Sequence, residues 1–314
     1  MDIVKESVVS KLLPKRSPTS HKGENGRVLI VGGSLDYFGA PILAGLGALY
    51  SGADLVYLFV PECNFDVSRS LYPDFIVKSF PGDFLTPRAT PQIIELGKNV
   101  DSILIGPGLS NNEKTTEAVI DIVNNLHVPT VLDADAIPAL KEIKKFPLEQ
   151  SIVVTPHGNE FENLVDRDIV VDEKDPKSIV LLRSLSMDLH INVLLKGHID
   201  YVSSEDGVVE KNITGNAGMT VGGTGDVLAG FVTSLLARRL EPFDAARCAA
   251  FFAGKAGDLL KKQKGECFSA SDLAMTLPYV LKGSTSKPFN YFFRSNSFVF
   301  HDVTTFFEDT RESF

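Results

Sequence analysis

Cysteine is scarce in this chain of 314 residues: only three are present, and none shows CxxC spacing. An odd number of cysteines without paired spacing indicates neither a disulfide framework nor a cysteine zinc site. We therefore expect Cys63, Cys248 and Cys267 to be free thiols without a chemical role. No apolar run reaches the about 18 to 20 residues of a membrane helix. Residues 1–18 mix charges with short apolar runs, so we predict a cytoplasmic protein without a signal peptide.

The sequence also lacks an excess of positive charge, since its net charge is −9 at pH 7. Nucleic acids and anionic membranes repel a negatively charged protein, so neither is an expected partner. The phosphate-binding motif GxxxxGK(S/T) is absent as well, which excludes a Walker-type nucleotide site. Any phosphate ligand must therefore be held locally, by backbone amides and a few lysines.

What is present is an alternation of short aliphatic runs and longer helical patterns, which predicts an α/β domain with a mostly parallel sheet covered by helices on both faces. Strands are predicted at residues 27–31, 54–60, 75–78, 102–105, 130–132, 151–154 and 192–195, with a hairpin at 201–203 and 208–211. Helices are predicted at 40–46, 92–97, 113–126, 227–240, 243–260 and 271–281. The domain is predicted to span residues 1–283, and a Phe-rich tail at 284–314 is expected to pack on it or on a second subunit.

The richest polar motif runs from Gly215 to Asp226, GNAGMTVGGTGD, and an apolar helical pattern follows it directly. Gly222, Gly223 and Gly225 let the backbone approach a ligand closely, and the N–H groups at a helix start bind anions. An isolated aspartate at a helix start is most often only an N-cap. Because an N-cap does not need the neighbouring glycines, we interpret this stretch as a phosphate site with Asp226 beside it as a base.

Other polar residues follow predicted strands, and the carboxyl ends of parallel strands meet at one edge of a sheet. Lys196 is the candidate cation there and Glu160 a candidate carboxylate facing magnesium. Each also has a structural interpretation: Lys196 as a surface lysine, Glu160 as a helix cap, and His157 as a loop or core histidine. Asp133 and Asp135 can likewise be interpreted as a turn residue and an N-cap.

Together these motifs resemble the ribokinase-like NAD(P)H-hydrate dehydratases, which repair hydrated nicotinamide cofactors. The matching segments cover roughly residues 16–282 in the order of that family. They are SHKG at 20–23, VGGS at 31–34, YFGAP at 37–41, GPGL at 106–109, LDADA at 132–136, TPH at 155–157, Glu160-Phe161, Lys196-Gly197 and the segment 215–230. The combination of GNxGM with GGTGDVLAG is highly specific, whereas GPG alone is weak.

The resemblance implies a ribokinase-like three-layer α/β/α fold. It also implies a nucleotide-dependent dehydration of the S-form of hydrated NADH or NADPH, which restores NAD(P)H and releases AMP and phosphate. Asp226 would be the catalytic base and would line the hydrated cofactor with Ala40, Gly108 and His157, while Glu160 would face Mg²⁺, directly or through water. The residues implied to hold the nucleotide and its phosphates are Lys196, Gly197, His198, Ile199, Asp200, Gly222, Gly223, Thr224 and Gly225.

The same resemblance favours ADP over ATP as the co-substrate, because the TPH form at 155–157 is that of the ADP users. It implies Mg²⁺ held mostly by phosphates and water, and a homo-oligomer, with a tetramer expected. It also implies a separate NAD(P)H-hydrate epimerase, because the sequence before the domain is too short to contain one.

Two features depart from the family pattern: Gly158-Asn159 stands where Pro-Gly is frequent, and the Phe-rich tail has no counterpart. Two other functions remain as alternatives, a vitamin-precursor kinase of the same fold and a nucleotide-binding regulator without catalysis. The GNxGM and YFGAP segments argue against the kinase, and the intact Asp226 argues against the regulator.

Overall fold

The computed structural model describes residues 1–144 and 146–282, so the predicted tail at 284–314 lies outside the described residues. In the described part, ten strands form one sheet in the order β1-β10-β9-β8-β7-β6-β5-β2-β3-β4. The strands are β1 (Asp2–Ile3), β2 (Arg27–Val31), β3 (Leu55–Pro61), β4 (Phe75–Phe80), β5 (Ser102–Ile105), β6 (Thr130–Leu132), β7 (Ile152–Val154), β8 (Asn192–Leu195), β9 (Asp200–Ser203) and β10 (Val209–Asn212). Strands β2 to β8 pair parallel with one another, whereas β9 pairs antiparallel with β8 and β10, and β1 pairs parallel with β10.

The parallel strands are short aliphatic runs because both of their faces are buried. Successive residues of β2 show this directly: Val28 and Ile30 belong to one hydrophobic core, and Leu29 and Val31 belong to the other. Since strand side chains alternate between the two faces, each core lies on its own side of the sheet. The mostly parallel sheet predicted from the sequence is therefore confirmed.

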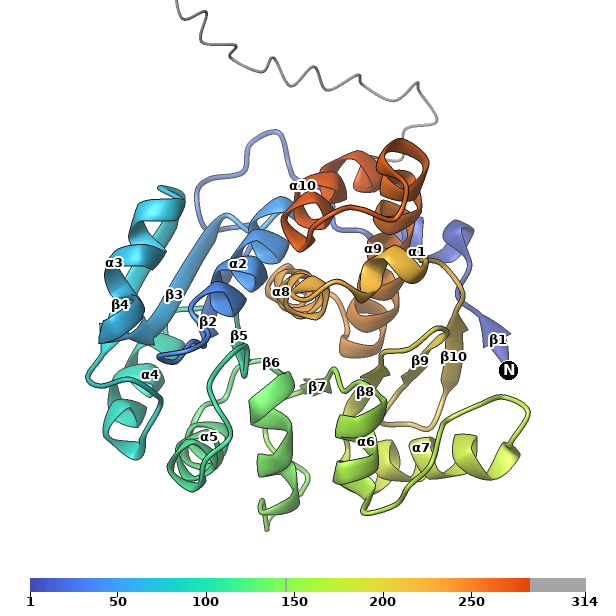
Figure 1. The fold of residues 1–314 in the computed structure, drawn as a ribbon, viewed down its shortest axis with the longest axis horizontal. Helices are drawn as coiled ribbons and strands as arrows, with labels where there is room; N and C mark the ends of the chain where they lie inside the picture. The colour runs from blue at the N-terminus through green and yellow to red at the C-terminus, as the bar shows by residue number, and fades with distance from the viewer. Residues whose placement is uncertain (145, 283–314) are drawn as a thin grey trace, which may run out of the picture. The chain divides into compact units, whose positions relative to one another are not determined.

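Helices cover both faces of the sheet (Figure 1). One face carries α2 (Gly39–Tyr50), α8 (Thr224–Ala237), α9 (Pro242–Lys264) and α10 (Ala270–Leu281). The other carries α4 (Thr90–Gly97), α5 (Glu113–Asn125), α6 (Gly158–Val165) and α7 (Pro176–Leu189). Helix α1 (Glu6–Leu12) packs on α9, and α3 (Glu62–Leu71) packs on β4. This arrangement is the expected three-layer α/β/α architecture.

Helices α2 and α8 approach each other through glycines. A Cβ atom on Gly47 would lie 2.1 Å from the backbone oxygen of Val227, and one on Gly230 would lie 1.9 Å from that of Ala44. No other residue type permits so close an approach, because every other side chain begins with a Cβ. The glycines of α2 and α8 thus allow the close packing that fixes α8 against α2.

Helix α8 begins at Thr224 rather than at the predicted residue 227. Asp226 therefore lies inside the first turn of the helix, and Gly223, with φ 95°, occupies the N-cap position. Strand β1 and helices α1, α3 and α7 were not predicted from the sequence.

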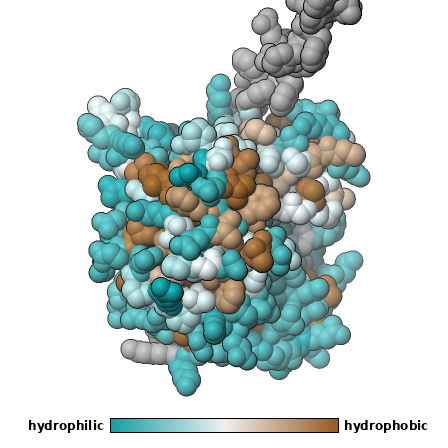
Figure 2. All heavy atoms as spheres, turned by 60° about the vertical axis from the view of Figure 1, so that its left-hand side comes forward, coloured by the Kyte–Doolittle hydropathy of each residue, from teal (hydrophilic) through white to brown (hydrophobic). Residues whose placement is uncertain are grey.

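The hydrophilic surface and the free cysteines agree with the amino-acid composition. Figure 2 shows a face that is mostly hydrophilic, with scattered hydrophobic areas rather than one continuous apolar patch. Cys63, Cys248 and Cys267 are all free, as predicted. No helix among the described residues has the length and apolarity that crossing a membrane requires.

Candidate active site

The strand order reverses between β2 and β5, which are neighbours although two strands separate them in the sequence. Ligands of open α/β sheets bind outside the carboxyl ends of the strands at such a reversal. The loops after these strands lie together there, since the Gly33 N–H donates to the Pro107 carbonyl at 2.8 Å. A Cβ atom on Gly108, whose φ is 68°, would lie 3.1 Å from the Ala40 Cβ. Ala40 and Gly108, both predicted to line the substrate, are therefore adjacent.

The loops after β5 and β6 are joined in the same way. A Cβ atom on Gly106, whose φ is 137°, would lie 1.7 Å from the Asp133 carbonyl oxygen, so this position admits only glycine. The Ser110 N–H donates to Asp135 Oδ2 at 3.0 Å. Burial raises the pKa of Asp135, the hydrogen bond from Ser110 opposes this rise, and the charge of Asp133 adds to it. Asp135 therefore ties the β5 loop to the β6 loop.

The first half of the glycine-rich stretch is held in place by helix α9. Asn216 accepts the Gly218 N–H at 3.0 Å and donates to Asp258 Oδ1 at 3.2 Å. Asp258 Oδ2 also lies 3.3 Å from the Gly215 nitrogen, whose N–H it accepts. Asn216 thereby caps a short 3-10 helix, η3 (Ala217–Thr220), so the GNxGM segment supports the loop that follows it.

The second half of the stretch opens helix α8. No side chain caps the N-terminus at Gly223, and Gly222 is exposed with open space where a Cβ would stand. Thr224 Oγ1 donates to the Met219 carbonyl at 2.7 Å, which fixes the turn that leads into the helix. An uncapped helix N-terminus presents backbone N–H groups and a partial positive charge, which favour anions. The predicted phosphate cradle therefore lies at a helix start with the features of an anion site.

Asp226 is half-buried in the first turn of α8. Burial raises its pKa to about 7, the charge of Asp133 adds to this rise, and the Lys196 ammonium opposes it. A base is most effective when its pKa lies near the working pH. The carboxyl is therefore suited to accept a proton at neutral pH.

Lys196 follows β8 and reaches a buried carboxylate. Its Nζ donates to Asp133 Oδ1 at 2.8 Å, and the two side chains are 19% and 2% exposed. Burial acts to lower the pKa of Lys196, but the charges of Asp133 and Glu160 outweigh it and the pKa is raised. A Cβ atom on Gly225 would lie 3.3 Å from the same Nζ. The ammonium thus lies beside the predicted phosphate cradle, and the interpretation of Lys196 as a surface lysine is wrong.

His157 and Glu160 form the N-terminal cap of α6. His157 Nδ1 accepts the Glu160 N–H at 3.3 Å, and Glu160 Oε2 accepts the His157 N–H at 2.7 Å. The interpretation of Glu160 as a helix cap is confirmed. Burial raises the pKa of Glu160, and the Lys196 ammonium opposes this rise. A parallel β-bridge pairs His157 with Lys196, so the exposed His157 lies in the row of strand ends.

The loop at residues 196–200 connects β8 to β9 and is closed by Asp200. Its Oδ1 accepts the Gly197 N–H at 3.1 Å, and its Oδ2 accepts from Asn212 Nδ2 at 3.0 Å. Burial raises the pKa of Asp200 to about 6, although both hydrogen bonds oppose this rise. Gly197 and His198 are exposed, whereas Ile199 is half-buried. Asp200 therefore fixes the shape of the loop, in which Gly197 and His198 are exposed.

The donors for a metal ion are few. Among residues 1–144 and 146–282, no three His, Cys, Asp or Glu side chains gather as a metal cage. Glu160 Oε2 is occupied by the cap of α6, and Asp133 accepts from both Lys196 and Thr155. These residues fit Mg²⁺ when most of its ligands come from phosphates and water, which is the arrangement Mg²⁺ commonly adopts.

The constellation lies within residues 28–279, the segment that matches the sequence profile of the NAD(P)H-hydrate dehydratases. The chain belongs to the NAD(P)H-hydrate dehydratase family. It is 40% identical over 272 residues, 86% of this chain and 52% of the relative, to the bifunctional NAD(P)H-hydrate repair enzyme Nnr of Methanothermobacter thermautotrophicus. It is 39% identical over 280 residues, 88% of this chain and 95% of the relative, to the ADP-dependent (S)-NAD(P)H-hydrate dehydratase of Nitrosopumilus maritimus.

The fold is also similar to that of a solved dehydratase. The crystal structure of ADP/ATP-dependent NAD(P)H-hydrate dehydratase from Bacillus subtilis, co-crystallised with ATP/Mg²⁺, superposes with a TM-score of 0.78 at 29% identity, covering 90% of this chain and 98% of that one. The ribokinase-like fold is thereby confirmed. The chain spans about half the length of the bifunctional relatives that it matches.

In this member of the dehydratase family, Asp133 and Thr155 lie beside Lys196, and the sequence alone predicts no specific role for either. A turn residue is the structural alternative for Asp133, yet its side chain caps no helix and accepts a hydrogen bond from Lys196. Thr155, which donates to Asp133 at 2.7 Å, was noted only as part of the TPH segment. Their position at the ends of predicted strands was the one available signal.

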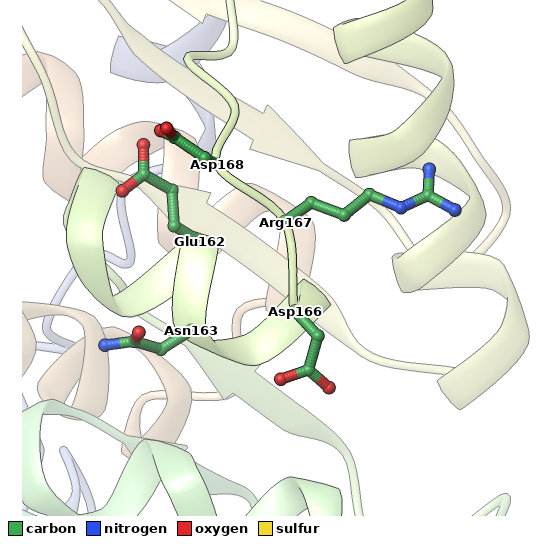
Figure 3. A pocket seen from close by; sticks show the side chains of 5 residues that line it. All are labelled: Glu162, Asn163, Asp166, Arg167 and Asp168. Carbon is green, nitrogen blue, oxygen red and sulfur yellow. The ribbon is translucent and has the colours of Figure 1, made fainter.

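A separate open depression lies at the C-terminal end of α6 and has no part in this site. Figure 3 shows its lining residues, with Arg167 pointing away from Glu162 and Asp168. Asn163 and Asp166 complete the lining, and Asp166 forms an ion pair with Lys141. None of these lining residues is a predicted site residue of the dehydratase.

Proposed function

We propose that this chain catalyses the ADP-dependent dehydration of the S-form of hydrated NADH or NADPH, releasing AMP and phosphate. The observation that carries the proposal is the meeting of three groups at the start of α8. Asp226 supplies a carboxyl with a pKa of about 7, Gly225 an uncapped amide, and Lys196 an ammonium next to it. The ADP-dependent relative, which this chain matches over 95% of that relative's length, supports the same activity.

The reaction divides into a phosphoryl transfer and an elimination. Asp226 takes the proton of the ring hydroxyl, whose oxygen forms a bond to the terminal phosphorus of ADP as the bond from that phosphorus to the AMP oxygen breaks. The phosphate ester then loses phosphate, assisted by the lone pair of the ring nitrogen. Loss of a proton from the neighbouring ring carbon restores the double bond of NAD(P)H. Phosphorylation makes the step feasible because phosphate leaves far more readily than hydroxide.

The remaining residues bind and orient the two substrates. Ala40, Gly108 and His157 are proposed to line the hydrated cofactor at the reversal of the strand order. The amides of the α8 N-terminus are proposed to stabilise the transferred phosphoryl group with preorganised charge. The residues proposed to border the nucleotide and its phosphates are Lys196, Gly197, His198, Ile199, Asp200, Gly222, Gly223, Thr224 and Gly225.

Mg²⁺ is proposed to accompany the nucleotide and to offset the charge of its phosphates. Glu160 would contact the ion through water, because one of its oxygens is committed to the helix cap. The relative from Nitrosopumilus maritimus is ADP-dependent and the one from Bacillus subtilis is ADP/ATP-dependent, which supports a nucleotide co-substrate.

The cellular location, the assembly and the partner enzyme are also part of the proposal. Three free cysteines support a cytoplasmic location. We further propose one catalytic domain at residues 1–283, a homotetramer, and a separate NAD(P)H-hydrate epimerase that supplies the S-form.

A spectroscopic assay tests the proposed function. The protein is incubated with hydrated NADH or NADPH, Mg²⁺ and either ADP or ATP, and the return of the near-ultraviolet absorbance of the reduced nicotinamide is followed. We expect recovery with wild type and none with Asp226→Asn. Absence of recovery with both nucleotides, or phosphorylation of a vitamin-precursor alcohol in its place, refutes the proposal.

A further inference from the structure

Three consecutive strands of the sheet, β6, β7 and β8, each deliver one polar side chain to a single buried cluster. Asp133 Oδ1 accepts from Lys196 Nζ at 2.8 Å and from Thr155 Oγ1 at 2.7 Å. Asp133 is 2% exposed and Thr155 is fully buried, so water does not compete for these contacts. The proposed chemistry uses Lys196 but assigns nothing to Asp133 or Thr155.

The spacing of the strands explains why a lysine is needed at the end of β8. Strands β6 and β8 flank β7 and therefore lie about 10 Å apart. The long side chain of Lys196 crosses the end of β7 to reach Asp133. At that point its ammonium lies beside the first turn of α8, 3.3 Å from where a Gly225 Cβ would stand. The carboxylate of Asp133 thus determines where the ammonium lies.

We propose that Asp133 is a positioning residue, which holds the Lys196 ammonium against the N-terminus of α8 where the transferred phosphoryl group lies. Thr155 fixes the orientation of the Asp133 carboxylate. The inference rests on the proposed function. A lysine side chain is flexible, and a charge-assisted hydrogen bond to a buried carboxylate selects one of its conformations before the nucleotide arrives. Charge that is placed in advance stabilises a transition state without reorganisation during the reaction.

Asp226 is sensitive to the same cluster. The charged groups that face it come from three other elements: Asp133 and Asp135 after β6, Lys196 after β8, and Glu160 in α6. Removing the charge of Asp133 takes away a group that raises the pKa of Asp226. It also leaves the Lys196 ammonium without its neutralising partner. The charge of Asp133 acts on this pKa more strongly than the charge of Lys196, so the pKa of the base should fall even though the ammonium is released.

The variant Asp133→Asn tests the proposal because it keeps the shape of the side chain and removes its charge. We expect kcat to fall by about tenfold or more, because the ammonium is no longer held in place. KM for the hydrated cofactor should change little, since Asp133 does not contact it. The acid limb of the kcat/KM profile should move to lower pH.

Two variants of Thr155 separate the effect of the Asp133 charge from the effect of holding the Asp133 carboxylate in place. Thr155→Val keeps the carboxylate charge, so we expect a lower kcat with the acid limb at its wild-type position, and Thr155→Ser should restore kcat. Asp168→Asn is the matched control, because it removes one exposed carboxylate outside the site and should change neither quantity. A purely structural role of Asp133 would lower Tm and leave the kcat of the folded variant at its wild-type value.

The pKa of Asp226 can be measured without substrate, by NMR of labelled aspartate carboxyls. This measurement therefore does not depend on the proposed function. If wild type regenerates no NAD(P)H, the proposed function fails, while the titration midpoints of wild type and Asp133→Asn still test the coupling. The inference is overturned if folded Asp133→Asn keeps the wild-type kcat, whatever its titration midpoint. Should Asp133→Asn not fold, an unchanged kcat in Thr155→Val overturns it instead.

Discussion

Replacing Asp226 by Asn is expected to stabilise the folded protein while it removes the base. Burial, with the charge of Asp133, raises the pKa of Asp226 from 3.8 to about 7. The folded chain therefore keeps this proton at pH values where the unfolded chain has lost it. Because the folded state binds more protons between pH 3.8 and about 7, its stability falls as the pH rises through that window.

The size of the effect follows from the shift. The pKa rises by about three units, and each unit corresponds to about 1.4 kcal/mol, so an ionised Asp226 costs up to about 4 kcal/mol above pH 7. Because the carboxyl is only half-buried, solvent screening reduces this to about 2 to 4 kcal/mol. An uncharged Asn avoids the cost. Asp226→Asn should therefore exceed wild type in the free energy of unfolding by this amount above pH 7, and the difference should vanish toward pH 3.8.

Urea unfolding followed by circular dichroism, at a series of pH values, measures this difference. Asp168→Asn is the control, because its carboxylate is exposed and its removal should give no such pH dependence. A difference between Asp226→Asn and wild type that does not grow with pH refutes the reasoning. A variant that is less stable than wild type above pH 7 refutes it more strongly.

Three other predictions follow from the same contacts. Gly230→Ala should lower the free energy of unfolding, measured in urea, by about 1 to 3 kcal/mol or more. The reason is that the new Cβ would lie 1.9 Å from the Ala44 backbone oxygen. A variant as stable as wild type would contradict the close packing of α2 and α8. Lys196→Met should lower kcat about 10²- to 10³-fold in the absorbance assay, and a wild-type kcat would remove Lys196 from the proposed chemistry. Chelation of Mg²⁺ with EDTA should stop NAD(P)H recovery and excess Mg²⁺ should restore it, whereas recovery in EDTA would exclude the metal.

Much of the fold follows from local sequence, because each parallel strand is a separate aliphatic run with turn residues beside it. The start of α8 was placed too late because glycine in a helix costs about 1 kcal/mol relative to alanine, so Gly225 favours a loop when it is considered alone. Packing against α2 overrides that preference. Helix α7 carried a signal that was not used, since Asp175 caps the Lys177 N–H and Pro176 opens the helix.

The candidate site was predictable as a set of strand ends but not as a set of contacts. Lys196 and Asp133 are separated by 63 residues, and their contact depends on the order β6-β7-β8. The sequence shows that both residues follow strands, yet it does not show which strands are neighbours. For Glu160, the sequence allows both a helix cap and a role facing magnesium. The hydrogen bonds in the structure show the helix cap.

The balance of charge at the site constrains how a nucleotide can bind. Asp133, Asp135 and Glu160 act on Asp226 with negative charge, and Lys196 alone opposes them. The net charge of −9 gives no attractive field from the rest of the chain. A polyphosphate can approach such a site when a divalent cation offsets its charge and the helix amides receive the remainder. Each phosphate that arrives should also favour the protonated form of Asp226, so the base must be freed by the Lys196 ammonium that Asp133 holds beside it. The acidity of this site is therefore a reason for the proposed metal and for the proposed fixing of Lys196 together.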